Sequence, residues 1–200
     1  MTSRLTTLLI ACTIAFQTGP LSAQVVRQEP AVLMVRMDIF VRSDRDSAGR
    51  VEVYARDLER RIKGLDIRVH DVIKDQDQLR RLYVLSREVG RPKPVLPAFY
   101  VCRRMYYGFV DRPTSGPAIE SLLNANLYTR STCSRCQQLK AFLPQLQRKW
   151  PAIKFVNHDV DRSPANRSTW QALCRSAGSV PGLPTIDFAR RVMIGYQGDE

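Results

Sequence analysis

Apolar residues in the first half of the chain alternate between the spacing of strands and the spacing of helices. Ala31–Val41 is apolar and rich in β-branched residues and predicts a strand, and Leu65–Val72 predicts a second one. Between them, apolar residues recur at helical spacing from Val51 to Ile62, and Gly64 stands where that helix would end. The pattern therefore predicts a strand, a helix and a second strand.

A second helix and a hairpin complete this first pattern. The helix is closed by Gly90, and two short strands follow at Ala98–Val101 and Met105–Phe109. A last helix is predicted at about Ala118–Asn124. The order β-α-β-α-β-β-α predicts an α/β unit in which helices cover a small sheet and connect parallel early strands.

The same order of elements begins again at about residue 126. Asn126–Arg130 and Ile153–Val160 are predicted as strands, and Thr185–Phe188 and Val192–Tyr196 as the closing hairpin. The first helix of this copy has an apolar face made of Leu139, Phe142, Leu143, Leu146 and Trp150. The sequence stops where the last helix should begin, so either this unit tolerates the loss of that helix or the chain ends early.

Five short motifs recur in the same order in both halves. Arg42-Ser43 recurs as Arg130-Ser131 and His70-Asp71-Val72 as His158-Asp159-Val160, both 88 positions later. Leu96-Pro97 recurs as Leu183-Pro184, Arg103-Arg104 as Arg190-Arg191 and Gly108 as Gly195, all 87 positions later. A constant order and spacing indicates a duplication, and we place the two units at residues 31–124 and 125–200.

The N-terminus has the pattern of a secretory signal peptide. A charged start is followed by the apolar stretch Leu5–Phe16 and a small-residue exit, with cleavage expected after Ala23. A membrane anchor is the competing interpretation, but the apolar run is shorter than the ~20 residues that a bilayer core requires. Cys12 also lies in a sequence similar to a lipoprotein cleavage box. We expect simple export to the periplasm or the extracellular space, with residues 1–23 removed and no transmembrane segment.

Composition narrows the class of protein. The chain is 44% hydrophobic and 25% charged, as expected of a folded globular protein. Its formal net charge is +12, but the arginines are scattered singly or in pairs without a dense block. Since an exported protein seldom meets nucleic acid, we interpret the charge as a solvated basic surface and expect no nucleic-acid partner.

Export also changes how the cysteines are interpreted. Removing the leader removes Cys12 and leaves Cys102, Cys133, Cys136 and Cys174, too few for a disulfide-stapled scaffold. Cys133-Ser134-Arg135-Cys136 is a CxxC motif at a predicted strand-to-helix junction. A cysteine just before a helix lies near unpaired backbone N–H groups and the positive end of the helix dipole, which favour a thiolate.

With Leu183-Pro184 opening the closing hairpin, the second unit resembles the thioredoxin/glutaredoxin superfamily, and exported thiol–disulfide oxidoreductases in particular. The resemblance extends to the first unit as a degenerate copy, in which Arg45 and Ala48 stand at the CxxC positions. It implies two tandem thioredoxin-like units, with Cys133 as the nucleophile and Cys136 as the resolving cysteine. It further implies a cis bond at Pro184 and a backbone at Leu183 that pairs with the substrate chain.

The second unit departs from the family in several positions. Ser131-Thr132 stands where thioredoxins have a tryptophan before the first cysteine, and no buried acidic residue or glutathione-binding Gly-Gly-Asp motif is evident. Arg135 lies between the two cysteines, and we expect its charge to favour the Cys133 thiolate. These departures argue against a standard thioredoxin and against a standard glutathione-dependent enzyme.

Several residues have competing interpretations. The cysteine pair could be half of a zinc site, but there is no second CxxC or CxxH to complete four ligands, so no metal is expected. Cys174 lies on an apolar helical face and is expected to be buried and inert. Cys102 lies at a turn, where it could be exposed and act as a third redox thiol or pair with another molecule. His158-Asp159 repeats His70-Asp71 of the cysteine-free copy, which favours a structural role at the strand end.

The sequence thus predicts a thiol–disulfide oxidoreductase that acts on exported proteins through the Cys133–Cys136 dithiol and needs no dissociable cofactor. Its partners would be exported proteins with disulfides or thiols, and a redox partner. Two alternatives stay open: a non-enzymatic binding module of the cell envelope, and a glutathione-linked reductase. The cysteine-free unit could bind substrate, mediate dimerisation or shield its neighbour.

Overall fold

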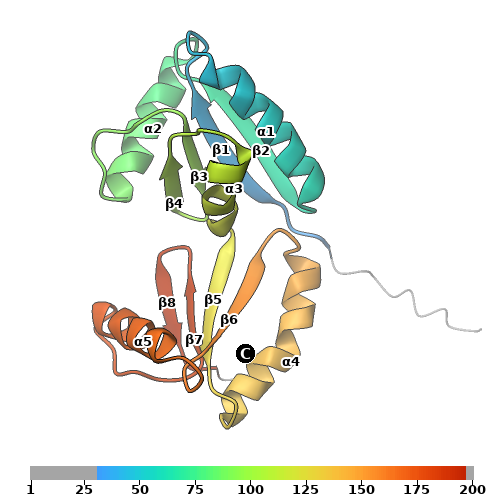
Figure 1. Ribbon diagram of the computed structural model, residues 1–200, viewed down its shortest axis with the longest axis vertical. Coiled ribbons are helices and arrows are strands. Elements are labelled where there is room, and N and C mark those ends of the chain that lie inside the picture. Colours follow the sequence, from blue (N-terminus) through green and yellow to red (C-terminus); the bar gives the residue numbers. More distant parts are fainter. Residues whose placement is uncertain (1–30, 197–200) are drawn as a thin grey trace, which may run out of the picture.

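The computed structural model describes residues 31–196, so the predicted leader, residues 1–23, lies outside the described residues. Two α/β units follow one another along the long axis of the molecule, each built on its own four-stranded sheet (Figure 1). The predicted fold class, two tandem thioredoxin-like units, is confirmed by the element order and the strand order of both sheets.

The first unit contains seven elements in the predicted order. They are β1 (Val35–Val41), α1 (Ser47–Arg61), β2 (Leu65–Asp71), α2 (Gln76–Glu88), β3 (Ala98–Val101), β4 (Arg104–Tyr107) and α3 (Arg112–Ser121). The sheet order is β2-β1-β3-β4, with β1 parallel to β2 and antiparallel to β3. The parallel pair is joined by α1, as a crossover connection requires.

The second unit repeats this arrangement. Its elements are β5 (Asn124–Thr129), α4 (Ser134–Lys149), β6 (Lys154–Asp159), α5 (Pro164–Ser176), β7 (Thr185–Phe188) and β8 (Arg191–Ile194). The sheet order is β6-β5-β7-β8, with β5 parallel to β6. Within residues 31–196 no helix follows β8, so the described part of this unit contains no counterpart of α3.

The last helix of the first unit is not where the apolar pattern placed it. The structure has α3 at Arg112–Ser121, whereas the sequence predicted about Ala118–Asn124. The helix begins early because the Asp111 side chain accepts a hydrogen bond from the Thr114 backbone N–H at 2.8 Å, with Pro113 in the first turn. Asn124 begins β5 instead of ending the helix.

Helices cover the two faces of the first sheet. One cluster of buried residues joins α1, α3 and the sheet, with Met37, Leu58, Phe99 and Ile119 all fully buried. A smaller cluster around Leu82 packs α2 on the opposite face. In the second unit α5 has the place of α2, and α4 has the place of α1 (Figure 1). The helices run from 10 to 16 residues, and none within residues 31–196 is long and apolar enough to cross a membrane.

The contacts between the two units include a hairpin turn and a close approach of Gly64 to the Pro151 ring. Arg104, just after the β3–β4 turn, donates to the Asn124 carbonyl at 2.9 Å and lies 3.5 Å from the Asp187 carboxylate. Gly64 approaches Pro151 so closely that a Cβ on the glycine would lie 2.7 Å from the proline Cγ. The first cluster of buried residues also takes in Ile153, so apolar packing continues from one unit into the next.

Candidate functional site

The CxxC motif lies where β5 ends and α4 begins. Cys133 is the N-cap of α4, and its Sγ accepts a hydrogen bond from the Cys136 backbone N–H at 3.2 Å. This contact gives the helix the N-terminal acceptor that a serine or aspartate would otherwise supply. Cys133 is partly exposed and Cys136 is fully buried, so the two thiols have unequal access to a partner.

Burial controls the chemistry of Cys136. It raises the pKa of this thiol to about 11, and the hydrogen bond with Cys133 acts in the same direction. A backbone hydrogen bond with Arg130 and the charge of Lys140 both lower the pKa, but they do not outweigh burial. Cys136 is therefore a neutral thiol at physiological pH until a neighbouring group removes its proton.

Lys140 was missed by the sequence analysis, which singled out Arg135. Arg135 is exposed in the first turn of α4, and its expected effect on Cys133 stays a prediction. Lys140 is half-buried four residues after Cys136, so both side chains lie on the same face of the helix. This i, i+4 spacing was the available signal in the sequence.

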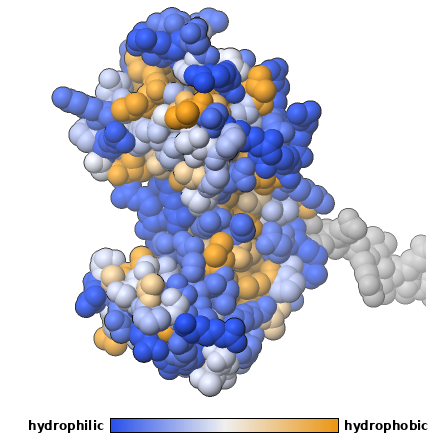
Figure 2. Space-filling model, viewed as in Figure 1, coloured by the Kyte–Doolittle hydropathy of each residue, from blue (hydrophilic) through white to orange (hydrophobic). Residues whose placement is uncertain are grey.

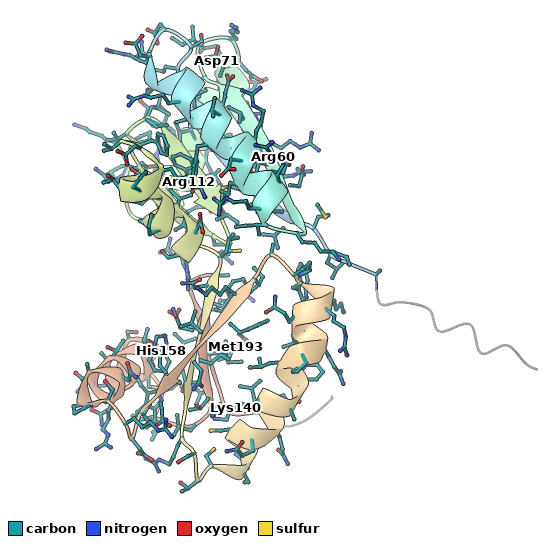
Figure 3. All side chains as sticks on the ribbon, turned by 45° about the vertical axis from the view of Figure 1, so that its right-hand side comes forward. Arg60, Asp71, Arg112, Lys140, His158 and Met193 are labelled. Carbon is teal, nitrogen blue, oxygen red and sulfur yellow. The ribbon has the colours of Figure 1, made fainter. Side chains whose placement is uncertain are left out.

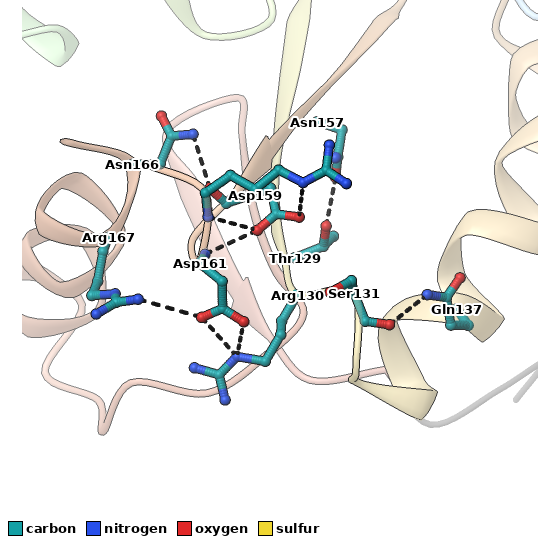
Figure 4. A network of polar contacts seen from close by, with 10 residues as sticks. Thr129, Arg130, Ser131, Gln137, Asn157, Asp159, Asp161, Asn166 and Arg167 are labelled. Atoms are coloured by element: carbon teal, nitrogen blue, oxygen red, sulfur yellow. Dashed lines mark hydrogen bonds and ion pairs between the residues drawn. The ribbon is translucent and has the colours of Figure 1, made fainter. Parts of the chain in front are cut away.

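A polar network fixes the loop that precedes Cys133 (Figure 4). Arg130 forms a 3.0 Å ion pair with Asp161, which also pairs with Arg167 of α5 at 3.4 Å. On the other side, the Gln137 side chain donates to the Ser131 carbonyl at 2.8 Å. The strand-end loop is thus held from both α4 and α5.

Leu183-Pro184 lies at the same edge of the sheet as the cysteine pair. Thr185, the first residue of β7, pairs with Tyr128 near the end of β5, from which the chain runs on to Cys133. The Leu183-Pro184 bond is cis, as the resemblance implied, and Pro184 is buried. Trp170 of α5 anchors this segment by donating to Thr185 Oγ1 at 3.0 Å.

The first unit retains the frame of this site without its thiols. Leu96-Pro97 is also cis, and the Pro97 carbonyl accepts from the Gly108 N–H at 2.7 Å, as Pro184 does from Gly195. Helix α1 begins after Asp46, whose side chain makes no capping hydrogen bond. The capping contact made by Cys133 therefore has no counterpart here.

The remaining cysteines differ from each other. Cys174 is fully buried, with its Sγ 3.8 Å from Thr185 Oγ1, as the sequence predicted. Cys102 is half-buried, so it is less exposed than its place at a turn suggested, and its role as a third redox thiol stays a prediction. It packs against the larger buried cluster beside the second unit, and burial raises its pKa to about 11.

The two histidines make matching contacts on their sheets. His70 Nε2 lies 2.8 Å from Asp38 Oδ1, and His158 Nε2 lies 3.1 Å from Asn126 Oδ1. The His158 ring stacks on Tyr128, with the ring centroids 5.1 Å apart. These contacts join neighbouring strands and agree with the structural role that the repeat indicated. Within residues 31–196, no three or more His, Cys, Asp or Glu residues gather as metal ligands would.

Comparisons with known proteins add little to this description. No protein-family model matches the chain, and no curated protein matches it. Among solved structures, it is similar to the crystal structure of the NTD_N/C domain of alkylhydroperoxide reductase AhpF from Enterococcus faecalis. That match has a TM-score of 0.33 and 9% identity, and it covers 84% of this chain and 88% of the other. So distant a likeness carries no functional argument.

Proposed function

We propose that the protein is a thiol–disulfide oxidoreductase that acts on exported proteins through Cys133 and Cys136. The observation that carries the proposal is the inequality of the two thiols. Cys133 is partly exposed and accepts the Cys136 N–H, while Cys136 is fully buried one helical turn further on. An accessible sulfur with a buried sulfur behind it is the arrangement needed to form a mixed disulfide and then resolve it.

The exchange proceeds in two balanced steps. The Cys133 thiolate attacks one sulfur of a substrate disulfide, so a Cys133–substrate bond forms and the other substrate sulfur leaves as a thiolate. Cys136 then gives up its proton and attacks the Cys133 sulfur. The Cys133–Cys136 disulfide forms, and the second substrate sulfur leaves as a thiolate that takes up this proton. The substrate gains two electrons and the cysteine pair loses them; the reverse sequence oxidises a substrate dithiol.

Leu183 would hold the substrate chain. Within residues 31–196, neither its N–H nor its carbonyl takes part in a backbone hydrogen bond, although the flanking backbone is anchored at Gly182 and Pro184. A backbone donor and acceptor that have no backbone partner within residues 31–196, just before β7 begins, suit pairing with an extended segment. The proposed setting outside the cytoplasm rests on the predicted leader and on the persistence of disulfides in oxidising compartments.

Trapping tests the proposal directly. We expect a Cys136→Ala variant to accumulate a mixed disulfide through Cys133 when mixed with a disulfide-bonded model peptide, as seen by mass spectrometry of non-reduced digests. Cys174→Ala, which changes a buried thiol on the other face of the sheet, is the matched control and should release the peptide as the wild type does. Absence of an adduct at Cys133, or equal adducts at Cys102, would contradict the proposal.

A further inference from the structure

The second sheet bears an apolar groove on the face that it shares with α4. The groove has a volume of about 430 Å³ and lies between the strands, α4 and the adjoining edge of the first unit. Its apolar walls are formed by Leu146, Trp150, Ile153, Phe155, Ile186, Phe188 and Met193. Figure 2 shows hydrophobic side chains gathered beside the junction of the two units, and in Figure 3 Met193 lies between the second sheet and α4. This groove is distinct from the cysteine pair, because Trp150 follows Cys133 by a whole helix of about 24 Å.

The internal duplication shows how unusual this exposure is. Leu58 of α1 is fully buried, whereas Leu146, at the equivalent position of α4, is half-buried. Phe99 of β3 is likewise fully buried, whereas its counterpart Ile186 is only partly so. Met193 of β8 is 46% exposed. The same face of the same fold is therefore closed in one unit and open in the other.

Helix α3 accounts for the difference. In the first unit α3 presents Ile119 to the buried cluster. Leu122 and Leu123, in the turn that directly follows the helix, join the same cluster, so the three residues have i, i+3, i+4 spacing. The second unit has no such helix within residues 31–196. The groove thus has the shape of a site for one amphipathic helix.

The charges beside the groove indicate which charged group a bound helix would carry. In the first unit Glu120 of α3 forms a 2.9 Å ion pair with Arg61 at the end of α1. The position of Arg61 is taken in α4 by Lys149, which directly follows Arg148, and α4 contains no aspartate or glutamate. A helix in the groove would therefore gain from a carboxylate placed like that of Glu120.

We propose that this groove binds an amphipathic helix of another protein, with apolar residues at i, i+3, i+4 and a carboxylate that faces Lys149. A helix laid in an apolar groove is a common mode of protein recognition. A second copy of this chain is a poorer occupant, because its net charge of +12 opposes self-association. The site is independent of the thiol chemistry proposed above.

The test uses two synthetic helical peptides as probes. One carries leucines at the spacing of Ile119, Leu122 and Leu123, repeated over three turns with glutamates beside them; the other has lysine for every glutamate. We expect fluorescence anisotropy to show that the full chain binds the acidic peptide at least about tenfold more tightly than the basic one. This difference in affinity should become smaller at high salt. Lys149→Glu should reverse this preference.

Matched variants separate groove binding from general stickiness. Met193→Glu should abolish binding of the acidic peptide, while Val84→Glu, at a site 54% exposed on α2, should leave it unchanged. Equal affinity for both peptides, or unchanged binding by Met193→Glu, would overturn the proposal. Two further results would overturn it. If sedimentation showed a dimer that Met193→Glu dissociates, the occupant of the groove would be a second copy of this chain. If the peptide bound only after residues 1–30 were removed, the occupant would be that segment. Met193→Glu should still form the Cys133 mixed disulfide in the Cys136→Ala background, so the two proposals can fail separately.

Discussion

Asp38 Oδ1 and His70 Nε2 lie 2.8 Å apart across the parallel pair β1 and β2. The other Asp38 oxygen accepts from Arg81 of α2 at 2.5 Å, so one buried carboxylate joins two strands and a helix. In the second unit Asn126 stands at the position of Asp38 and keeps the histidine contact without the charge. The duplication has therefore retained the strand pairing but left the ionic link to the helix in one copy only.

Asp38→Asn tests the value of that link. The amide can keep the contact with His70, as Asn126 does with His158, but it cannot pair with Arg81. Because Arg81 is 40% exposed and can be solvated, we expect a loss of about 1–2 kcal/mol in the free energy of unfolding. Urea denaturation measures it. Asp77→Asn, which breaks an exposed pair with Arg80, is the control and should cost less than about 0.5 kcal/mol.

The contacts of Asp38 with Arg81 and His70 should also make the free energy of unfolding depend on pH. Burial raises the pKa of the Asp38 carboxyl, but the hydrogen bonds from Arg81 and His70 outweigh it, and the pKa lies below its usual value. A carboxyl with a lowered pKa stabilises the folded state above its unfolded pKa, and this contribution is lost as pH falls through the folded value. The stability gap between the wild type and Asp38→Asn should therefore narrow below about pH 4. A gap that stays constant down to pH 2 would show that the carboxylate charge contributes nothing.

Local patterns were enough to predict the strands, most helices and the duplication. The cysteine placement at the start of α4 and the burial of Cys174 also followed from spacing, because both depend on neighbours within one helix. The position of the last helix of the first unit, in contrast, could not be predicted from the spacing of apolar residues. The Asp111 cap and Pro113 in the first turn start α3 early, and in the sequence these two signals were outweighed by the apolar run that follows them.

Contacts between distant segments could not be predicted from spacing. Arg104 and Asp187 are 83 residues apart, and only the docking of one unit on the other brings them together. The partial burial of Cys102 has the same origin, since the cluster that it packs against also takes in Ile153 of the second unit. The exposure of one face of the second sheet could not be predicted from the sequence either, because it becomes evident only when the burial of Leu146 is compared with that of Leu58.

Gly64 tests the contact between the units. Its φ of +80° is strained for any L side chain, and an added Cβ would also meet Pro151 at 2.7 Å. Gly90 has a similar φ of +83° but open space around it. We expect Gly90→Ala to cost about 1–2 kcal/mol, the strain of a left-handed residue, and Gly64→Ala to cost clearly more. Adding Pro151→Ala to Gly64→Ala should recover the difference; equal costs for the two glycines would contradict a tight contact here.

Tyr54 and Tyr107 allow a second comparison, between two hydroxyls that differ in their hydrogen bonding. The Tyr54 hydroxyl is buried with no hydrogen-bond partner within residues 31–196, and burial raises its pKa to about 12. The Tyr107 hydroxyl lies 2.7 Å from Ser86 Oγ. Tyr54→Phe should be neutral or stabilising by up to about 1 kcal/mol, whereas Tyr107→Phe should cost about 1 kcal/mol in thermal or chemical unfolding. A loss at Tyr54 as large as that at Tyr107 would mean that its hydroxyl has a partner in solution.

Leu58 and Leu146 test whether the groove is open in solution. They are equivalent residues of α1 and α4, but Leu58 is fully buried in the cluster that also contains Ile119 of α3, whereas Leu146 borders the groove. Leu58→Ala should cost about 2–5 kcal/mol, because it removes apolar contacts and leaves a cavity. Leu146→Ala should cost about 1 kcal/mol, since its side chain already meets solvent and no closed cavity forms. Both are measured by urea denaturation of the full chain, with unchanged m values as the check on two-state unfolding. If Leu146→Ala proved as costly as Leu58→Ala, the face would be covered in solution.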